Sequence, residues 1–198
     1  MTVFLLLAAG NSSRMGKPKM LLPFNGKTLL QHSIDEIKKI TDQKLLVVTG
    51  CYHSLLKEQL QQQQILFFQN EHWQEGMASS IGAGMKYILQ YFPDAVNVMI
   101  LVCDQPFISA GLFQQMITKK AELVKGIIAC KYNDTTGVPV LFDKKYFARL
   151  AILKGDVGAK KLVQQFVEDT AVIDFPEGAA DIDTPEDYEK FIKTPNKI

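Results

Sequence analysis

The sequence predicts a single α/β domain of three layers, in which a mostly parallel sheet is covered by helices on both faces. Apolar runs typical of buried strands alternate along the chain with segments that repeat apolar residues at helical spacing. The run at 95–102 is apolar at nearly every position, as expected for a central parallel strand. A chain of 198 residues can bury a sizeable core in one domain, so we assign residues 1–198 to one domain.

The first third of the chain is expected to contain three strands and two helices. Apolar runs place the strands at 2–9, 44–49 and 65–69. Helical spacing predicts a helix at 29–40, capped by Thr28, and a second helix from about residue 52. The glutamines at 61–64 are interpreted as the solvated end of that second helix.

The remaining elements continue this alternation. Small residues at 76–84 are interpreted as a loop that a ligand can approach closely, leading into a helix at 85–91. After the strand at 95–102 we expect a helix at 112–120, strands at 124–130 and 135–142, helices at 144–153 and 159–166, and a strand at 171–175. Pro139 lacks a backbone N–H, so its strand is expected to lie at an edge or to start there. Thr184 and Pro185 are expected to begin a last helix.

Composition and charge exclude two classes of partner. The formal net charge is +1, so there is no large excess of cations with which to coat nucleic acid or an anionic membrane. The first ten residues are mostly apolar, but they lack a preceding cation and are too few to span a bilayer. We therefore expect neither a signal peptide nor a membrane segment.

The cysteines and histidines predict a reducing compartment and no zinc site. Cys51, Cys103 and Cys130 are odd in number, and each lies in or beside an apolar run, which is typical of buried thiols in a cytoplasmic protein. The sequence contains no CxxC pair, and its three histidines are scattered.

The strongest functional signal is the stretch LLLAAGNSSRMGKPKMLLPF at residues 5–24. A buried strand ends abruptly at Gly10, and small polar residues and three cations follow before apolar residues resume. Gly10 and Gly16 allow the loop to curl and to turn several N–H groups toward a ligand, while Arg14 and Lys19 add full positive charges. The loop is therefore expected to hold phosphate. It is not a P-loop, because five residues separate the two glycines and Pro18 stands where a Ser or Thr is needed.

A carboxylate is expected at the same edge of the sheet. Asp104 follows the central strand directly, at the position where ligands bind in open α/β sheets. A carboxylate beside a phosphate site requires a cation, and Mg²⁺ accepts oxygen ligands from both groups. A second carboxylate is available in Asp181 or Asp183, although each of these acids could instead serve only in a turn or a helix cap.

Nucleophilic hydrolysis is not supported by the sequence. The four serines at 12, 13, 79 and 80 have no histidine close by in the sequence, and no GxSxG motif occurs. His32 is expected on a helix and is interpreted as a packed or surface histidine.

These motifs resemble those of the MobA-like nucleotidyltransferases and, within them, the molybdenum cofactor cytidylyltransferase (MocA-like) branch. The resemblance begins with LAAGNSSRMGKPKMLLP and continues in the family's order with GMASSIGAG, VCDQP, GVPVLF, GDVGAK and DIDTPEDY. It implies a Rossmann-like domain of the nucleotide-diphospho-sugar transferase type that binds an NTP and Mg²⁺. The implied activity is transfer of CMP from CTP to the phosphate of molybdopterin, with release of pyrophosphate.

The resemblance also assigns roles to individual residues. The nucleotide would be lined by Ala8, Ala9 and Gly10, and its β and γ phosphates would be held by Ser12, Ser13 and Arg14. Lys19 would contact the α phosphate, so that Arg14, Lys19 and Asp104 form the catalytic set. Asp104 and Asp183 would ligate Mg²⁺. Gly76 and Ser80 would lie near the base, and the acceptor would be contacted by Gly137, Pro139, Asp156 and Lys160.

Two departures from the family pattern affect the acceptor side. Val138 stands where the family often has His, and Lys160 stands where Arg is frequent, so the bidentate fork for phosphate is missing. The alternatives are transfer of GMP from GTP to the same type of acceptor, transfer to a sugar phosphate, and a non-catalytic module that delivers the cofactor. Transient contact with a molybdoenzyme or its chaperone is also implied. A dehydrogenase is disfavoured because the first turn lacks GxGxxG.

Overall fold

The computed structural model describes residues 1–60, 65–155 and 158–193. The glutamines at 61–64 and Asp156 lie outside these residues, so the predictions for them are not addressed by the fold.

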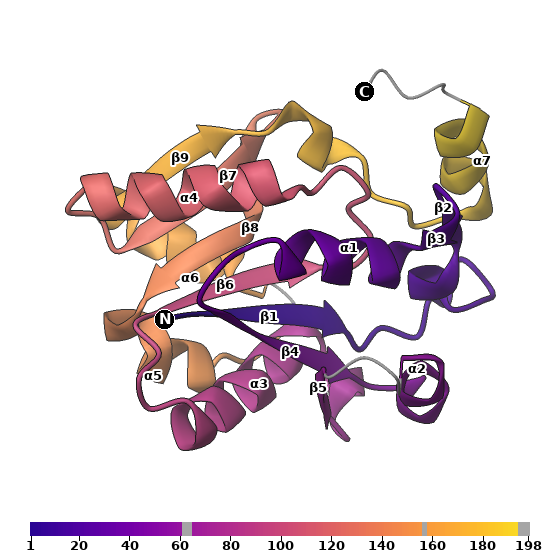
Figure 1. Ribbon diagram of the computed structural model, residues 1–198, viewed down its shortest axis with the longest axis horizontal. Helices are drawn as coiled ribbons and strands as arrows, with labels where there is room; N and C mark the ends of the chain where they lie inside the picture. The colour runs from indigo at the N-terminus through magenta and orange to yellow at the C-terminus, as the bar shows by residue number, and fades with distance from the viewer. Residues whose placement is uncertain (61–64, 156–157, 194–198) are drawn as a thin grey trace.

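The described residues form a seven-stranded sheet with the order β5-β4-β1-β6-β8-β7-β9 (Figure 1). The strands are β1 (Thr2–Ala8), β4 (Gln43–Thr49), β5 (Leu66–Gln69), β6 (Asn97–Val102), β7 (Ile127–Tyr132), β8 (Thr135–Asp143) and β9 (Thr170–Asp174). Strand β8 runs antiparallel to both of its neighbours, and the other strand pairs are parallel. The prediction of a mostly parallel sheet is therefore confirmed.

Helices cover both faces because the residues of each central strand alternate between two cores. Phe4 and Leu6 of β1 pack with α1 (Leu29–Lys38) and α4 (Ala110–Glu122) on one face. Helix α2 (His53–Gln59) adds a buried side chain to the same core. Val3 and Leu5 pack with α3 (Met77–Tyr91), α5 (Phe147–Ala151) and α6 (Lys160–Gln165) on the other. This arrangement is the predicted three-layer sandwich.

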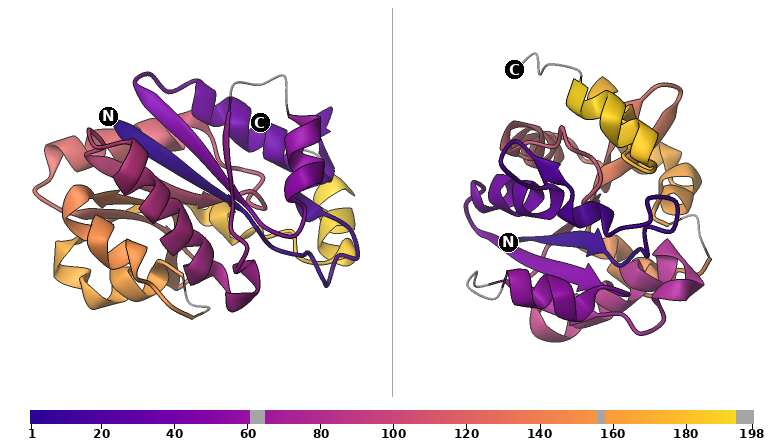
Figure 2. Two further views of the ribbon diagram at one scale, coloured as in Figure 1. Left: turned by 90° about the horizontal axis from the view of Figure 1, so that it is seen from below. Right: turned by 90° about the vertical axis from the view of Figure 1, so that its right-hand side faces the viewer.

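The N-terminal loop and the C-terminal helix lie together at one end of the sheet, as Figures 1 and 2 show. The short hairpin of β2 (Pro23–Phe24) and β3 (Lys27–Thr28) shares a small apolar core with Ile182 and with Tyr188 and Phe191 of α7 (Pro185–Lys193). Contacts between segments so distant in sequence bring the 181–184 segment to the loop that follows β1.

The prediction of a loop at 76–84 is wrong, because helix α3 already begins at Met77. The glycines in this segment allow close packing rather than a loop. A Cβ added at Gly84 would lie 2.5 Å from Leu5 Cδ1 and 2.9 Å from Val48 Cγ2, so only glycine lets the helix approach β1 and β4 this closely.

The predicted position of Pro139, on an edge strand or at a strand start, is also wrong, because β8 lies between β6 and β7 and begins at Thr135. The register of β7 against β8 shifts between Ala129 and Cys130, and Pro139 lies on the β8 side of this irregularity. A bulge leaves residues outside the ladder, which removes the need for an N–H at this position.

Two further elements and one cysteine differ from the predictions. Strand β7 starts at Ile127 rather than at 124, since Val124 is fully exposed. The helix expected at 144–153 is divided into a 3₁₀ turn, Lys144–Tyr146, and α5. Cys103 and Cys130 are buried as predicted, whereas Cys51 is exposed in the turn that follows β4.

The described helices include none that is both long enough and apolar enough to cross a membrane.

Candidate functional site

A pocket of about 380 Å³ opens at the carboxyl ends of β1 and β6. Because these strands are parallel neighbours, the residues that follow them meet at one edge of the sheet. Seven of the predicted site residues line this pocket, and they are Ala8, Ala9, Gly10, Lys19, Gly76, Ser80 and Asp104.

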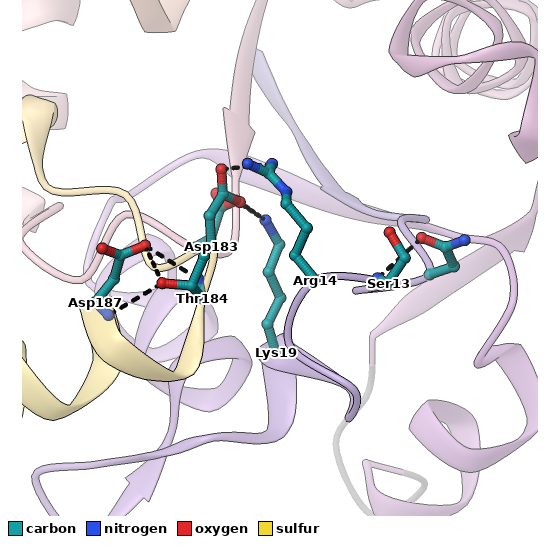
Figure 3. Close-up of polar contacts among 8 residues, drawn as sticks. Ser13, Arg14, Lys19, Asp183, Thr184 and Asp187 are labelled. Atoms are coloured by element: carbon teal, nitrogen blue, oxygen red, sulfur yellow. Dashed lines mark hydrogen bonds and ion pairs between the residues drawn. The ribbon is translucent and has the colours of Figure 1, made fainter.

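Two of these residues, Lys19 and Asp104, belong to a network of two cations and two carboxylates. Figure 3 shows Arg14 and Lys19 directed toward Asp183. Lys19 Nζ donates to Asp104 Oδ2 and, at 2.9 Å, to Asp183 Oδ1. Arg14 Nη2 donates to the second oxygen of Asp183 at 2.7 Å. The structure therefore brings together the three predicted catalytic residues and both predicted metal ligands.

The charges in this network perturb one another. Burial alone would lower the pKa of Lys19, but the charge of Asp104 and hydrogen bonds to both carboxylates outweigh burial and raise it. Burial alone would raise the pKa of Asp183, but Lys19 and Arg14 outweigh it and lower that pKa. Both groups are therefore charged at neutral pH, and Lys19 is held as a cation between two anions.

Asp181 lies outside this network of ion pairs. Burial and the charges of Asp104 and Asp183 raise the pKa of the Asp181 carboxyl to about 6. Lys19 and Arg14 instead contact Asp183, which agrees with the choice of Asp183 over Asp181 as the second acid of the site.

The carboxylates fit a divalent cation that is also bound by phosphate. Within the described part of the chain, the buried atom Asp104 Oδ1 has no hydrogen-bond partner, although its side chain is only 15% exposed. No group of three or more His, Cys, Asp or Glu side chains is arranged as a metal site among the same residues. Mg²⁺ needs only one or two carboxylates when substrate phosphates complete its coordination, so the oxygens of Asp104 and Asp183 suit it.

The loop after Gly10 is shaped by its own hydrogen bonds. Ser12 adopts a positive φ of 52°, and its carbonyl accepts from Met15 N at 2.9 Å and Gly16 N at 3.1 Å. Ser12 Oγ accepts from the backbone N–H of Lys19 at 3.0 Å, which closes the loop at the residue that carries the ammonium group. Ser13 is exposed, and its backbone N–H donates to Asn11 Oδ1 at 3.2 Å.

The C-terminal segment is fixed to β6 by two contacts that place Asp183. Gln105 Nε2 donates to the carbonyl of Gly178 at 3.0 Å, and the backbone N–H of Ile182 donates to the carbonyl of Asp104 at 3.4 Å. Immediately after Asp183, Thr184 caps α7 as predicted, because its Oγ1 accepts from the N–H of Asp187 at 3.2 Å. These contacts explain how an acid from a distant segment reaches Lys19.

The three described residues that were predicted to face the acceptor, Gly137, Pro139 and Lys160, lie outside the pocket lining. Gly137 is part of β8, and a Cβ there would lie 2.1 Å from Tyr132 Oη. Pro139 is two residues further along the same strand. Lys160 is exposed at the start of α6. Nearby, Gly158 packs on α3, since a Cβ there would lie 2.8 Å from Met77 Sδ.

Several pocket residues were not identified from the sequence. Trp73, Gln74 and Met77 also line the pocket, and Gln105, which is not part of its lining, positions the segment that carries Asp183. The only sequence signal was the position of Trp73 three residues before the glycine-rich block. His32 agrees with its predicted structural role, since it packs on Phe24 and its Nε2 lies 3.2 Å from the carbonyl of Ile108.

A larger hollow of about 900 Å³ lies between β5, α3 and α5. Its described lining contains neither the acidic network nor the loop after β1, so we do not assign the transfer chemistry to it.

Comparison with known proteins agrees with this geometry. The family model described as MobA-like NTP transferase domain matches residues 4–170. A curated relative, the bifunctional protein GlmU of Francisella philomiragia, is 28% identical over 141 residues. That match covers 70% of this chain but only 30% of GlmU, so the chain spans about a third of that relative.

Solved structures share the fold over nearly the whole chain. Rv0371c from Mycobacterium tuberculosis H37Rv is 26% identical with a TM-score of 0.79, covering 97% of this chain and 98% of its own. A second structure of Rv0371c, at 24% identity, a TM-score of 0.78 and 98% coverage of both chains, is a complex with manganese. Molybdopterin-guanine dinucleotide biosynthesis protein A from Archaeoglobus fulgidus is 15% identical with a TM-score of 0.69 and covers 96% of each chain.

Proposed function

Since this chain belongs to the MobA-like NTP transferase family and is a nucleotidyltransferase, we propose that it transfers CMP from CTP to the phosphate of a molybdopterin-type acceptor. An oxygen of the acceptor phosphate attacks the α phosphorus of CTP in line and forms a new P–O bond. The bond from the α phosphorus to the oxygen that bridges to the β phosphorus breaks, and pyrophosphate leaves.

One observation carries this proposal. Lys19 lies between Asp104 and Asp183 at the end of a pocket walled by the strand end Ala8 to Gly10. A partly buried ammonium beside two carboxylates and a glycine-containing loop suits a reaction in which phosphates and a cation must be aligned. A non-catalytic carrier has no need for charges placed in this way.

Lys19 and Arg14 are suited to stabilise negative charge on different phosphates. Phosphoryl chemistry requires alignment and neutralisation of the charge that develops on the phosphate oxygens. Lys19 has a side chain that is 19% exposed, so its charge acts in a partly water-excluded place. Arg14 has a side chain that is 68% exposed, which leaves it accessible to the outer phosphates and the leaving pyrophosphate.

We further propose that Mg²⁺ is the divalent cation and that Asp104 and Asp183 hold it. When bound, Mg²⁺ would neutralise phosphate charge and help to orient the triphosphate. Lys19 contacts Asp104 Oδ2 and Asp183 Oδ1, whereas Asp104 Oδ1 has no hydrogen-bond partner among the described residues and would be open to the cation. Lys19 would contact the α phosphate beside it.

The acceptor is proposed to enter from the β8 side of Asp104. Strand β8 runs antiparallel to β6, so its first residues lie at the same edge of the sheet as the end of β6. The ring of Tyr132 packs on Gly137. Burial and the charge of Asp181 raise the pKa of the Tyr132 hydroxyl. The charges of Asp181 and of the network residue Asp104 both act on Tyr132, which lies against Gly137, and this supports the assignment of Gly137 and its strand neighbour Pro139 to the acceptor side. Lys160 and Asp156 remain predictions from the resemblance.

The preference for CTP is proposed on steric grounds. The methyl group of Ala9 lines the pocket, where it limits how closely a purine can approach the backbone. We also propose a cytoplasmic location and a transient contact with a molybdoenzyme or its chaperone, because the modified cofactor has to reach an apoenzyme.

The test measures pyrophosphate release by the purified protein with each of the four NTPs, Mg²⁺ and molybdopterin. We expect release with CTP that requires both Mg²⁺ and the acceptor. Parallel reactions replace molybdopterin by a sugar phosphate and Mg²⁺ by Mn²⁺. A GTP preference, a sugar-phosphate preference, or tight pterin binding without turnover would each overturn the proposal in favour of a different alternative.

A further inference from the structure

The pocket has a second end that the reaction scheme leaves unused. Trp73, Gln74 and Met77 line it there, and all three belong to the turn and the first residues of α3. Trp73 is only partly buried, so its indole is not simply part of the core. An accessible aromatic ring within a ligand-sized pocket is a candidate contact surface.

Trp73 is held rigidly against the end of β4. A Cβ added at Gly50 would lie 2.7 Å from Trp73 Cβ and Cγ, and 2.4 Å from the carbonyl oxygen of Ala9. Glycine at position 50 therefore allows the base of the tryptophan side chain to pack directly on the backbone that follows β4 and β1. A larger residue would push the indole out of this position.

A buried polar network fixes the turn that carries Trp73. Asn70 is 4% exposed, and its Nδ2 lies 2.9 Å from Ser79 Oγ and 3.0 Å from Ser80 Oγ. Its Oδ1 accepts from the backbone N–H of His72 at 3.0 Å. Ser79 Oγ in turn donates to the carbonyl of His72 at 2.8 Å. A side chain positioned by a fully engaged network is suited to recognise a rigid ligand.

The sheet order separates Trp73 from the acidic network by one strand. Trp73 packs beside the end of β4, Asp104 follows β6, and β1 lies between these two strands. With roughly 4.8 Å between adjacent strands, the two ends of the pocket are about 10 Å apart along the sheet edge. An NTP also has an aromatic end and a charged end, since its base and its phosphates extend from opposite ends of the ribose.

We propose that Trp73 is the surface on which the base of the bound NTP stacks. The inference rests on the proposed function, because it takes an NTP as the ligand and Lys19 as its phosphate contact. Stacking on an aromatic ring is tolerant of base identity, so Trp73 provides affinity for every NTP. Discrimination between CTP and GTP then falls to other groups, of which Ala9 is one.

The chain contains one tryptophan, so fluorescence excited selectively at tryptophan, and not at tyrosine, reports on Trp73 alone. The wild-type protein is titrated with CTP, GTP, ATP and UTP in the presence of Mg²⁺, and with inorganic tripolyphosphate as the probe without a base. We expect each nucleotide that binds to alter the emission and to protect Trp73 from quenching by acrylamide. Tripolyphosphate should bind without either effect.

Variants then separate stacking from a purely structural role. Trp73→Ala should weaken CTP binding about ten-fold or more in calorimetry and leave tripolyphosphate binding unchanged. Trp73→Phe keeps an aromatic face and should bind CTP within about three-fold of the wild type. Tyr91→Ala is the matched control, because it removes an exposed ring from the far end of α3.

The outcomes distinguish this inference from the function on which it depends. If CTP binds but the emission and acrylamide protection do not change, or if tripolyphosphate changes them equally, the stacking role is refuted while the transferase proposal stands. If no NTP binds the wild-type protein, both are refuted. Should Trp73→Ala fail to fold, the wild-type titration and the Trp73→Phe variant still decide the question.

Discussion

Replacing Lys19 with Met removes the ammonium group that links Asp104 to Asp183 and preserves most of the aliphatic stem. Two facing carboxylates would then remain without the cation between them. We expect the metal-free variant to be less stable than the wild type and to regain stability when Mg²⁺ is added. We also expect its turnover to fall, because Lys19 is the residue assigned to the α phosphate.

The magnitude follows from the burial of the three side chains. Removing one partner of a fully buried ion pair costs about 3–5 kcal/mol. Lys19, Asp104 and Asp183 are 19%, 15% and 32% exposed, and Asp183 keeps its contact with Arg14. We therefore expect a loss of about 2 kcal/mol in the free energy of unfolding. A loss of about 2 kcal/mol of transition-state stabilisation would slow turnover roughly 30-fold.

The assay is urea unfolding of Lys19→Met with and without Mg²⁺, paired with a turnover measurement. Lys17→Met is the matched control, because it removes the same charge from the same loop, where Lys17 Nζ instead lies 5.8 Å from the ring of Tyr188. Near-normal turnover in a folded Lys19→Met protein would refute the role of Lys19. Equal destabilisation with and without Mg²⁺ would refute the idea that a cation can replace its ammonium group.

Three further changes test other parts of the structure. Burial alone would raise the pKa of Asp169, but hydrogen bonds from Lys145 and Tyr146 outweigh burial and lower it to about 2. The contribution of ionised Asp169 to the free energy of unfolding is therefore present above pH 4 and is lost as the pH falls toward 2. Asp169→Asn should therefore cost about 1 kcal/mol above pH 4 in urea unfolding, and the difference from the wild type should vanish near pH 2. Gly84→Ala should destabilise the fold by about 1–2 kcal/mol through overpacking. The control Gly111→Ala in α4, where a Cβ meets only Ser109 Oγ at 3.7 Å, should be neutral or stabilising. Equal effects of the two substitutions would contradict the close-packing explanation. Ala9→Gly should raise turnover with GTP relative to CTP, and an unchanged ratio would remove Ala9 as a determinant of the base.

The sequence predicted the sheet and its layers because buried strands leave long apolar runs that local pattern can detect. It failed where distant residues override local propensity. Gly84 looked like part of a loop, yet it lies within α3, and it is glycine because Leu5 and Val48 leave no room for a side chain. Pro139 looked like an edge residue, and only the register shift in β7 allows it in an interior strand.

Some residues of the candidate site could likewise be predicted from local sequence, whereas others depend on distant contacts. The loop after β1 and Asp104 were identified because glycines, cations and an acid follow strands directly. The choice between Asp181 and Asp183 depended on which carboxylate Arg14 and Lys19 reach, and that depends on the path fixed by Gln105. Trp73 was missed because its position is set by Gly50, a residue on another strand end.

The most direct test of the central claim is a single-turnover reaction with CTP labelled at the α phosphorus, excess enzyme, Mg²⁺ and molybdopterin. The proposed site predicts that the label moves to the molybdopterin product, that unlabelled pyrophosphate is released in equal amount, and that Asp104→Asn abolishes both. Recovery of the label as unreacted CTP, with molybdopterin bound to the folded wild-type protein, would contradict the claim that Lys19, Asp104 and Asp183 form a nucleotidyl transfer site.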